Sequence, residues 1–305
     1  MDTASPSLRN ASQPEPLNIT AVVLTFNEES NLEACLQSIS GWTQAIYVID
    51  SGSTDRTPEI AAHHGAELMR HEFQSHTEQW QWALAQLPAS STWVLALDAD
   101  QRITAELRNE LTLLFRDNSA QLDEVDGLYI NRRQVFRGKW IKHGGYYPKY
   151  LMKLFRRDRV TFDSLDLVDH HFYVKGPSRK LRFDLIEQNH KEDDISFWID
   201  KHNRYAVRLA EEELRRRSHQ GPQPVFPSLL GSPDQRSLWL KTAWSRLPLY
   251  IRPVIYFTYR YIFQLGFLDG KTGFIFHVLQ AFWFRLLIDI NLEQLKSARR
   301  RSGTE

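Results

Sequence analysis

Three apolar runs in the first hundred residues each end in a cluster of polar side chains. The runs Ile19–Leu24 and Ala45–Ile49 are rich in β-branched residues, and every side chain from Val94 to Leu97 is apolar. Short continuous apolar runs are typical of strands buried on both faces, as the central strands of a parallel sheet are. The pattern therefore predicts three buried strands in this part of the chain.

Two helices are predicted after the first and second strands. Over Asn31–Ile39 the apolar positions recur with helical spacing, at Leu32, Cys35, Leu36 and Ile39. The segment Thr57–His63 has Pro58 in a first-turn position, where a helix does not need its N–H. Strands that alternate with helices in this way predict a parallel α/β layer with right-handed connections.

The polar clusters follow the three strands directly, at Thr25–Ser30, Asp50–Asp55 and Asp98–Asp100. Each cluster alone also suits a turn or a helix cap. Because ligands bind at the carboxyl ends of the strands in open α/β sheets, three such clusters in order favour one shared site. Asp98 and Asp100 would lie on one side of an extended strand and repel each other without a cation. Hard divalent ions take carboxylate oxygens and often bridge to substrate phosphates.

Five segments together resemble the inverting nucleotide-sugar glycosyltransferases of family 2, which have the GT-A fold. More narrowly, they are similar to the bacterial branch that builds lipopolysaccharide core and exopolysaccharide. The resemblance covers roughly residues 18–295, and no single segment is specific by itself. The segments are Thr25–Glu29, Val48–Asp55, Leu97–Asp100, the basic Lys153–Arg157 and the glycine-containing Gly266–Gly273.

The resemblance implies an α/β fold of the GT-A type, with a mixed sheet flanked by helices, and a metal-dependent transfer. Asp100 would coordinate Mg²⁺ or Mn²⁺, and Asp98 would support the metal or contact the ribose. The donor would be a nucleoside-diphosphate sugar, and the acceptor would be a glycan or glycolipid. The side chains implied in nucleotide binding are Thr25, Asn27, Glu28, Asp50, Ser53 and Asp98. We also expect Arg156 and Arg157 at the rim of this site, in contact with phosphate.

An inverting transfer needs a base that takes the proton of the acceptor hydroxyl. Relatives carry V-D-E-H-F or V-H-E-H-F where this chain has Val168–Phe172, so a histidine occupies the usual glutamate position. The candidates, in order, are Asp169, His170 and Asp166. For any one of the histidines here, a structural role is an equally good interpretation.

Two other functions remain open on the sequence alone. A sugar nucleotidyltransferase also uses an α/β sheet, acids and Mg²⁺, but the first strand here lacks a glycine-rich phosphate loop with a following basic residue. A catalytically inactive membrane-attached scaffold is the other alternative. It is suggested by three departures from the family pattern, namely Trp80, Gln101 and His170.

Composition fits a soluble-type catalytic domain with an appendage. The net charge of +1 gives no indication of nucleic-acid binding, and the single cysteine suits a reducing cytoplasm. Residues 1–16 lack the basic start and apolar core of a signal peptide. We expect a disordered tail at 1–16, a catalytic domain at 17–217, a linker at 218–237, a helical segment at 238–296 and a basic tail at 297–305.

The segment Leu238–Leu295 is aromatic and aliphatic but is interrupted by arginines and a lysine. No uncharged apolar run in it reaches the ~20 residues of a spanning helix. Its pattern favours amphipathic helices that lie on a membrane surface. The alternatives are a helical subdomain packed on the sheet and a homodimer interface. We therefore expect a cytoplasmic protein that is peripheral on the inner face of the bacterial plasma membrane.

Overall fold

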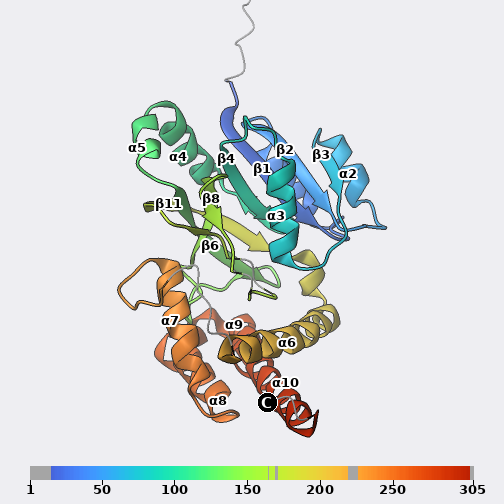
Figure 1. Ribbon diagram of the computed structural model, residues 1–305, viewed down its shortest axis with the longest axis vertical. Helices are drawn as coiled ribbons and strands as arrows, with labels where there is room; N and C mark the ends of the chain where they lie inside the picture. The colour runs from blue at the N-terminus through green and yellow to red at the C-terminus, as the bar shows by residue number, and fades with distance from the viewer. Residues whose placement is uncertain (1–14, 164, 169–170, 219–225, 303–305) are drawn as a thin grey trace, which may run out of the picture.

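The computed structural model describes residues 15–163, 165–168, 171–218 and 226–302 of the chain. Most of the expected tail at 1–16 lies outside these residues, as do Asp169, His170 and part of the expected linker. A sheet with helices on both faces forms the upper part of the molecule in Figure 1, and a group of helices lies below one edge of it.

The main sheet has nine strands in the order β3-β2-β1-β4-β8-β6-β11-β5, with β7 paired to β6. The predicted strands are β1 (Leu17–Thr25), β2 (Thr43–Asp50) and β4 (Trp93–Asp98), and β1 runs parallel to both of the others. Next to them β8 is antiparallel to β4 and β6, so the sheet is mixed. The remaining strands are β3 (Glu67–Arg70), β5 (Gln101–Ile103), β6 (Gly127–Phe136), β7 (Lys139–Trp140), β8 (Tyr150–Arg156) and β11 (Ser178–Gln188), with β9 (Val160–Thr161) and β10 (Tyr173–Val174) in a separate pair.

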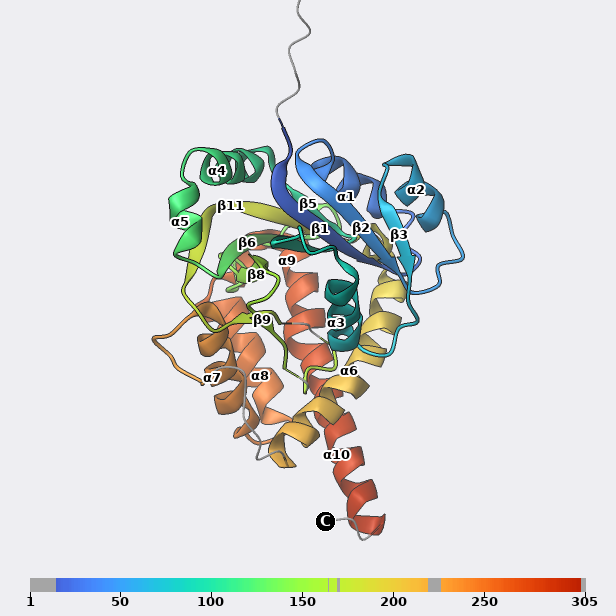
Figure 2. The same ribbon diagram turned by 45° about the horizontal axis from the view of Figure 1, so that its top comes forward.

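Each face of the sheet has its own hydrophobic core, because successive side chains of a strand point to opposite faces. On one face Val23 and Leu95 pack with α1, α2 and α4, and on the other Val22 and Val94 pack with Trp80 of α3. The central strands are thus buried on both sides, as their apolar runs predict. The helices on the sheet are α1 (Leu32–Ile39), α2 (Thr57–His63), α3 (His76–Gln86), α4 (Ala105–Arg116) and α5 (Ser119–Asp123). Figure 2 shows α3 on the side opposite to α1 and α2.

The lower part of the molecule is built on a long helix, α6 (Ile195–Ser218), which packs against α10 (Phe284–Ser302). Small residues such as Ala206 and Ala210 of α6 face Ile288 and Leu292 of α10. Helix α7 (Pro233–Ser245) begins inside the segment expected as a linker. The other elements here are η1 (His190–Asp193), α8 (Ile251–Thr258), η2 (Tyr259–Phe263), η3 (Gly266–Asp269), α9 (Gly270–His277) and η4 (Val278–Trp283).

Among the described residues, one helix is long and apolar enough to cross a membrane by length and composition. It is the continuous stretch Gly266–Ser302, whose most apolar window is 39% buried inside the protein. No membrane-spanning segment was expected from the sequence, because charged residues interrupt every apolar run of the required length. The α10 end of this helix is held by α6, and its Asp289 is fully buried in an ion pair with Arg252. The helix is therefore at least partly a core helix of the protein.

Candidate active site

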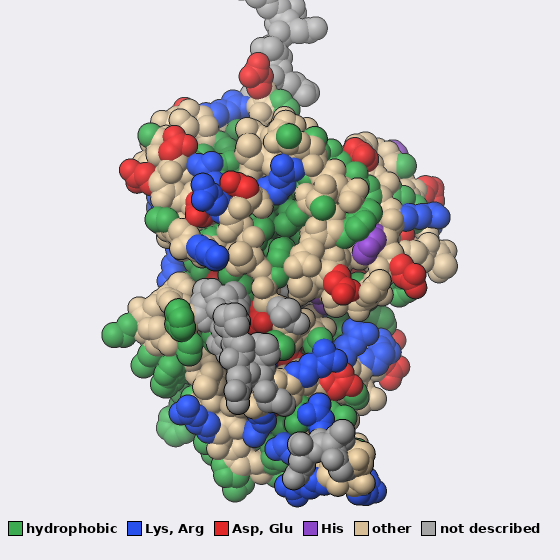
Figure 3. All heavy atoms as spheres, viewed as in Figure 1, with side chains coloured by type: hydrophobic (Ala, Val, Ile, Leu, Met, Phe, Trp, Pro, Cys, Tyr) green, Lys and Arg blue, Asp and Glu red, His purple; other side chains and the backbone are tan. Residues whose placement is uncertain are grey.

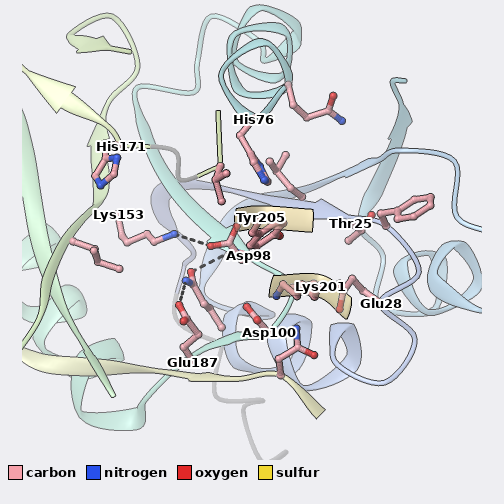
Figure 4. Close-up of a pocket in the computed structure, with 18 of the residues that line it drawn as sticks. Thr25, Glu28, His76, Asp98, Asp100, Lys153, His171, Glu187, Lys201 and Tyr205 are labelled. Atoms are coloured by element: carbon pink, nitrogen blue, oxygen red, sulfur yellow. Dashed lines mark hydrogen bonds and ion pairs between the residues drawn. The ribbon is translucent and has the colours of Figure 1, made fainter. Parts of the chain in front are cut away.

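A pocket of about 860 Å³ lies where the carboxyl ends of β1 and β4 meet β8, β11 and the helices α3, α6 and α7. Several side chains from the predicted strand ends point into it (Figure 4). The strands deliver Thr25, Asp98, Lys153 and Glu187, and Glu28 and Asp100 lie just beyond strand ends. The expected convergence of polar strand ends therefore exists for Thr25, Glu28, Asp98 and Asp100.

The first acid of the pair, Asp98, is the last residue of β4 and is matched by a lysine from the neighbouring strand. The Lys153 ammonium donates to the Asp98 carboxylate at 3.1 Å, and the Lys153 side chain is almost completely buried. Because β8 runs antiparallel beside β4, it brings Lys153 to this end of the sheet. The negative charge of Asp98 is thus already compensated by the protein.

Gln101, one of the departures from the family pattern, lies between two acids. Its side-chain oxygen accepts the Asp98 N–H at 3.2 Å, and its amide nitrogen donates to Glu187 at 2.7 Å. A glutamate at this position would place a second carboxylate against Glu187. The uncharged amide of Gln101 therefore avoids repulsion with Glu187. Despite this departure, Asp98 and Asp100 both line the pocket.

The second acid, Asp100, lies in the turn after β4 and lines the pocket. No ion pair or hydrogen bond of its carboxylate is found within the described part of the chain. Burial raises the pKa of Asp100 well above its usual range, and the nearby Glu187 and Asp98 raise it further. Excess negative charge is therefore concentrated at this point of the pocket.

A metal ion at Asp100 would need further ligands. Within residues 15–163, 165–168, 171–218 and 226–302, no group of three or more His, Cys, Asp or Glu side chains is placed to hold one. Magnesium sites commonly combine one or two carboxylates with waters and substrate phosphates. A half-buried carboxylate without a cation, in a pocket large enough for a nucleotide, fits that kind of site.

Asp50 lies beneath the pocket instead of lining it. Its carboxylate is fully buried and accepts hydrogen bonds from the Ser53 N–H at 2.9 Å, the Gly52 N–H at 3.1 Å and the Thr25 hydroxyl at 3.1 Å. The Ser53 hydroxyl also donates to it. Gly52 has a φ of 92°, which favours glycine. Asp50 therefore holds the turn that follows β2 and positions Thr25.

Asn27 and Ser53 link the loops after β1 and β2. Asn27 has a left-handed backbone, with a φ of 54°. Its N–H donates to the Ser53 hydroxyl at 2.8 Å, and its side-chain oxygen accepts the Thr54 N–H at 2.9 Å. The next residue, Glu28, lines the pocket and forms an ion pair with Lys191 at 2.5 Å. Asn27 and Ser53 do not line the pocket, so Glu28 is the residue of these three that can contact a ligand.

Asp166 is a buried ion-pair partner and supports a histidine of the pocket. It lies 2.6 Å from Arg216 and 3.0 Å from Nδ1 of His171. Burial alone would raise the pKa of Asp166, but the hydrogen bond from His171 and nearby cations lower it below its usual range. A carboxylate with a low pKa is a weak base near neutral pH. His171 lines the pocket, and Asp166 orients its ring.

Residues 20–173, just over half of the chain, match the model of the family described as glycosyl transferase family 2. The chain belongs to glycosyl transferase family 2. The match includes the strand-end clusters, the aspartate pair and His171; among these residues, Thr25, Glu28, Asp98, Asp100 and His171 line the pocket. The chain is an enzyme of this family with the GT-A fold, and its sequence resemblance to the family is confirmed.

Individual relatives are distant. The lipopolysaccharide core biosynthesis glycosyltransferase LpsC of Rhizobium meliloti (strain 1021) is 25% identical over 276 residues, which cover 87% of this chain and 91% of LpsC. Residues 1-349 of S. aureus TarS match 93% of this chain and 91% of that one, with 15% identity and a TM-score of 0.42. Glucosyl-3-phosphoglycerate synthase from Mycobacterium tuberculosis, in complex with Mn²⁺, UDP and glucosyl-3-phosphoglycerate, covers 40% of this chain and 45% of its own, with 22% identity and a TM-score of 0.29.

The glycine-containing segment of this family 2 glycosyltransferase, Gly266–Gly273, lies outside the pocket and clamps a loop. The buried Asp269 accepts the His143 N–H at 2.9 Å and lies 2.8 Å from Nδ1 of the same histidine. A Cβ on Gly273 would come within 2.3 Å of Asp269 Cβ. The segment therefore fixes helix α9 against the loop that precedes β8.

Arg156 and Arg157 do not lie at the pocket rim, contrary to the expectation from their basic motif. Because β8 is antiparallel to β4, Arg156 lies beside Trp93 at the opposite end of the sheet. Arg156 donates to the Leu122 carbonyl at 2.9 Å and Arg157 to the Leu87 carbonyl at 2.7 Å. Both arginines tie down loops, and only Lys153 of this motif lines the pocket.

The pocket of this glycosyltransferase also contains residues that the sequence analysis did not single out. Many of them come from residues 187–208, and no motif marks this region. Figure 4 shows Glu187, Lys201 and Tyr205 around the pair Asp98 and Asp100. The lining residues from this region are Glu187, Asn189, Lys191, Phe197, Lys201, Arg204, Tyr205 and Arg208.

Proposed function

We propose that this enzyme moves a sugar, with inversion, from a nucleoside-diphosphate sugar to a hydroxyl group of a lipopolysaccharide core, a lipid-linked oligosaccharide or an exopolysaccharide precursor. The observation that carries the proposal is Asp100, a carboxylate in the pocket with no ion-pair partner among the described residues. Similarity to LpsC over 87% of the chain supports an acceptor of the lipopolysaccharide type.

Each residue predicted to bind the nucleotide has a proposed role in the half of the pocket that would hold the donor. Thr25 and Glu28 contact the nucleoside, while Asn27, Asp50 and Ser53 hold the two loops that carry them. Asp100 holds a Mg²⁺ or Mn²⁺ ion, which supplies neutralisation of the charge on the leaving nucleoside diphosphate. Asp98, paired to Lys153, keeps the end of β4 in place beside it.

The proton of the acceptor hydroxyl goes to the segment 166–171. Asp169 remains the first candidate and His170 the second, and both lie outside the described residues. Asp166 fits a positioning role, since Arg216 and His171 occupy its carboxylate. His171 adds a candidate, because Asp166 binds its Nδ1 and the ring borders the pocket. With Nδ1 held by Asp166, the other ring nitrogen, Nε2, is left as the proton acceptor.

The helices below the sheet present an apolar face that supports attachment to a membrane surface. Exposed apolar side chains follow one another through α8, η2, η3 and α9, and Phe263 is 74% exposed. Figure 3 shows hydrophobic side chains over α7 and α8, at the end of the molecule far from the sheet. Basic Lys271 and the run Arg299–Arg301 can meet anionic headgroups. The exposed members are Ile251, Val254, Ile255, Tyr259, Ile262, Phe263, Leu265, Phe267, Leu268 and Phe274.

Transfer itself is tested with nucleotide sugars and a natural acceptor. The full-length protein is incubated with Mn²⁺, each common nucleotide sugar and lipopolysaccharide from cells that lack this protein. We expect one donor to be consumed, with its sugar recovered on the lipopolysaccharide in the opposite anomeric configuration. Consumption of a nucleoside triphosphate and a sugar phosphate with release of pyrophosphate would contradict the proposal.

Membrane attachment is tested by sedimentation with vesicles. We expect the protein to sediment with vesicles that contain anionic lipid, and Phe263→Asp with Leu268→Asp to abolish this. Leu113→Asp, at an exposed leucine of α4, is the matched control and should have no effect. If the double variant instead changes the protein from a dimer to a monomer and vesicle binding is absent, the face is a homodimer interface.

A further inference from the structure

One face of helix α6 carries cations into the pocket. Lys201, Arg204, Tyr205 and Arg208 all line it, and their spacing of three and four residues places them on one side of the helix. Figure 3 shows Lys and Arg side chains gathered over α6. The sequence analysis did not mark this stripe, since α6 lies outside the family motifs.

The cations of this stripe differ in their partners. Lys201 forms an ion pair with Glu192 at 2.7 Å. Further along α6, Arg216 pairs with three acids and Arg217 with one. In contrast, no described carboxylate lies within ion-pair distance of Arg204 or Arg208, and both side chains are exposed. The two arginines that face the pocket are therefore available to a ligand.

A third cation reaches the pocket from another helix. Lys241 belongs to α7, lines the same pocket and has no ion-pair partner among the described residues. The pocket is thus bordered by cations on two helices, α6 and α7. Three unpaired cations at one end of a pocket favour a ligand with negative charge.

Position along α6 separates these cations from the donor phosphates. Lys201 is close enough to Asp100 to oppose the rise in the pKa of that carboxyl. Since a helix rises about 1.5 Å per residue, Arg204 and Arg208 lie roughly 4.5 and 10 Å further along the axis. Further along the same helix Arg216 binds Asp166, so Arg204 and Arg208 lie between the Asp100 end of the pocket and the segment proposed to take the acceptor proton.

We propose that the acceptor carries an anionic group close to its reacting hydroxyl, and that Arg204, Arg208 and Lys241 bind it. The guanidinium fork forms paired hydrogen bonds with phosphate or carboxylate, and such charge-assisted bonds orient as well as attract. Binding the acceptor by this group would hold its hydroxyl toward the donor sugar. This inference rests on the proposed function and deepens it by naming the substrate class.

Binding of three small sugars tests the proposal. The protein is first saturated with Mn²⁺ and a nucleoside diphosphate, and glucose, glucose 6-phosphate and glucuronate are then titrated into it. We expect at least one of the two anionic sugars to bind at least tenfold more tightly than glucose. The anion that binds more tightly tells whether the natural group is a phosphate or a carboxylate.

Two variants connect the preference to the residues. Arg204→Gln with Arg208→Gln should lose at least tenfold in affinity for the anionic sugar, while affinity for the nucleoside diphosphate changes less than twofold. Arg215→Gln is the matched control, because Arg215 is exposed on the same helix and does not line the pocket. Its affinities should equal those of the wild type.

Three results would overturn the proposal. If the protein binds nucleotide but binds all three sugars with equal affinity, the proposal of an anionic acceptor is wrong, while the proposed function stands. Equal losses of nucleotide and sugar-phosphate affinity in the double variant would mean that the arginines hold the donor. If no nucleoside diphosphate binds with Mn²⁺, the proposed function fails, and the acceptor site fails with it.

Discussion

Lys153 Nζ lies 3.1 Å from the Asp98 carboxylate and neutralises the first acid of the pair, whereas Asp100 has no such partner in the described part of the chain. The two aspartates, only two residues apart, are therefore electrostatically different. Asp98 belongs to the framework at the end of β4, and Asp100 is available to a ligand. This difference supports a structural role for Asp98 and a ligand-binding role for Asp100.

Lys153→Met should destabilise the protein, because it leaves Asp98 without its buried cation. Removing one partner of a buried polar pair costs about 1–3 kcal/mol. The free energy of unfolding in urea measures the loss. Lys153→Met combined with Asp98→Asn removes both charges and should cost less than the sum of the single variants. Strictly additive losses would show that the two side chains do not interact.

Asp169→Asn should stop transfer and spare donor binding, if Asp169 is the base. Loss of a general base typically lowers a rate by about 10²–10⁴-fold. Transfer is followed with saturating donor and acceptor, and nucleotide affinity is measured on the same preparation. Should donor binding disappear together with transfer, Asp169 has a structural role instead.

Asp166→Asn tests whether the Asp166–His171 pair matters for proton transfer. Asp166 binds both His171 and Arg216, so its loss frees the histidine ring and removes one of the three acids that Arg216 binds. We expect a fall in the rate of transfer and a displaced pH–rate profile, with nucleotide affinity unchanged. His171→Gln should lower the rate by a similar factor. A normal pH–rate profile for both variants would leave Asp169 and His170 as the candidates.

The buried Arg252 should account for much of the stability of the lower helices. Its guanidinium binds Glu213 of α6 at 2.9 Å and Asp289 of α10 at 2.6 Å, and its side chain is fully buried. Arg252→Met should lower the free energy of unfolding by about 3–5 kcal/mol, because two acids lose a buried partner. Arg217→Gln, which removes a half-exposed partner of Glu213, should cost less than about 1 kcal/mol. Equal losses in urea unfolding would contradict the assignment.

Stability should fall as the pH is lowered from about 6.5 to about 4. Burial, and after it Arg260, lowers the pKa of His277 to about 4. The unfolded chain, in which a histidine titrates near about 6.5, therefore binds more protons across this range. His277→Leu removes this proton and should flatten the dependence of unfolding free energy on pH. His63→Leu, at an exposed histidine, should leave the slope unchanged; a slope unchanged by His277→Leu as well would contradict the assignment.

Elements with a clear local pattern were predictable from sequence. Helix α2 has the predicted bounds, and β4 extends the predicted run by one residue at each end. Trp80, a departure from the family pattern, is fully buried beside Phe172 and fills the core instead of altering the pocket. Such features depend on neighbours in the chain and on one hydrophobic face, which the sequence displays directly.

Other parts of the site depend on pairings between distant segments. Strand β11 carries charges at many positions and shows no clean alternation, so it was not recognised. It nevertheless pairs with β6 and β5 and brings Glu187 to the pocket. The role of Asp50 could not be predicted from the sequence, because only the fold shows that its carboxylate oxygens accept hydrogen bonds from the protein itself. The same holds for Arg156, whose place follows from the direction of β8.

The most direct measurement is calorimetric titration of a panel of nucleoside diphosphates into the full-length protein, with and without Mn²⁺. We predict that at least one of them binds in the presence of the metal and much more weakly in its absence. Asp100→Asn should abolish the metal-dependent part of the affinity, since the neighbouring acids Asp98 and Glu187 are already paired with Lys153 and Arg132. Gln101→Ala, beside it in the chain, should keep the metal dependence. Nucleotide binding by Asp100→Asn that is as tight and as metal-dependent as that of the wild type would contradict the assignment of Asp100.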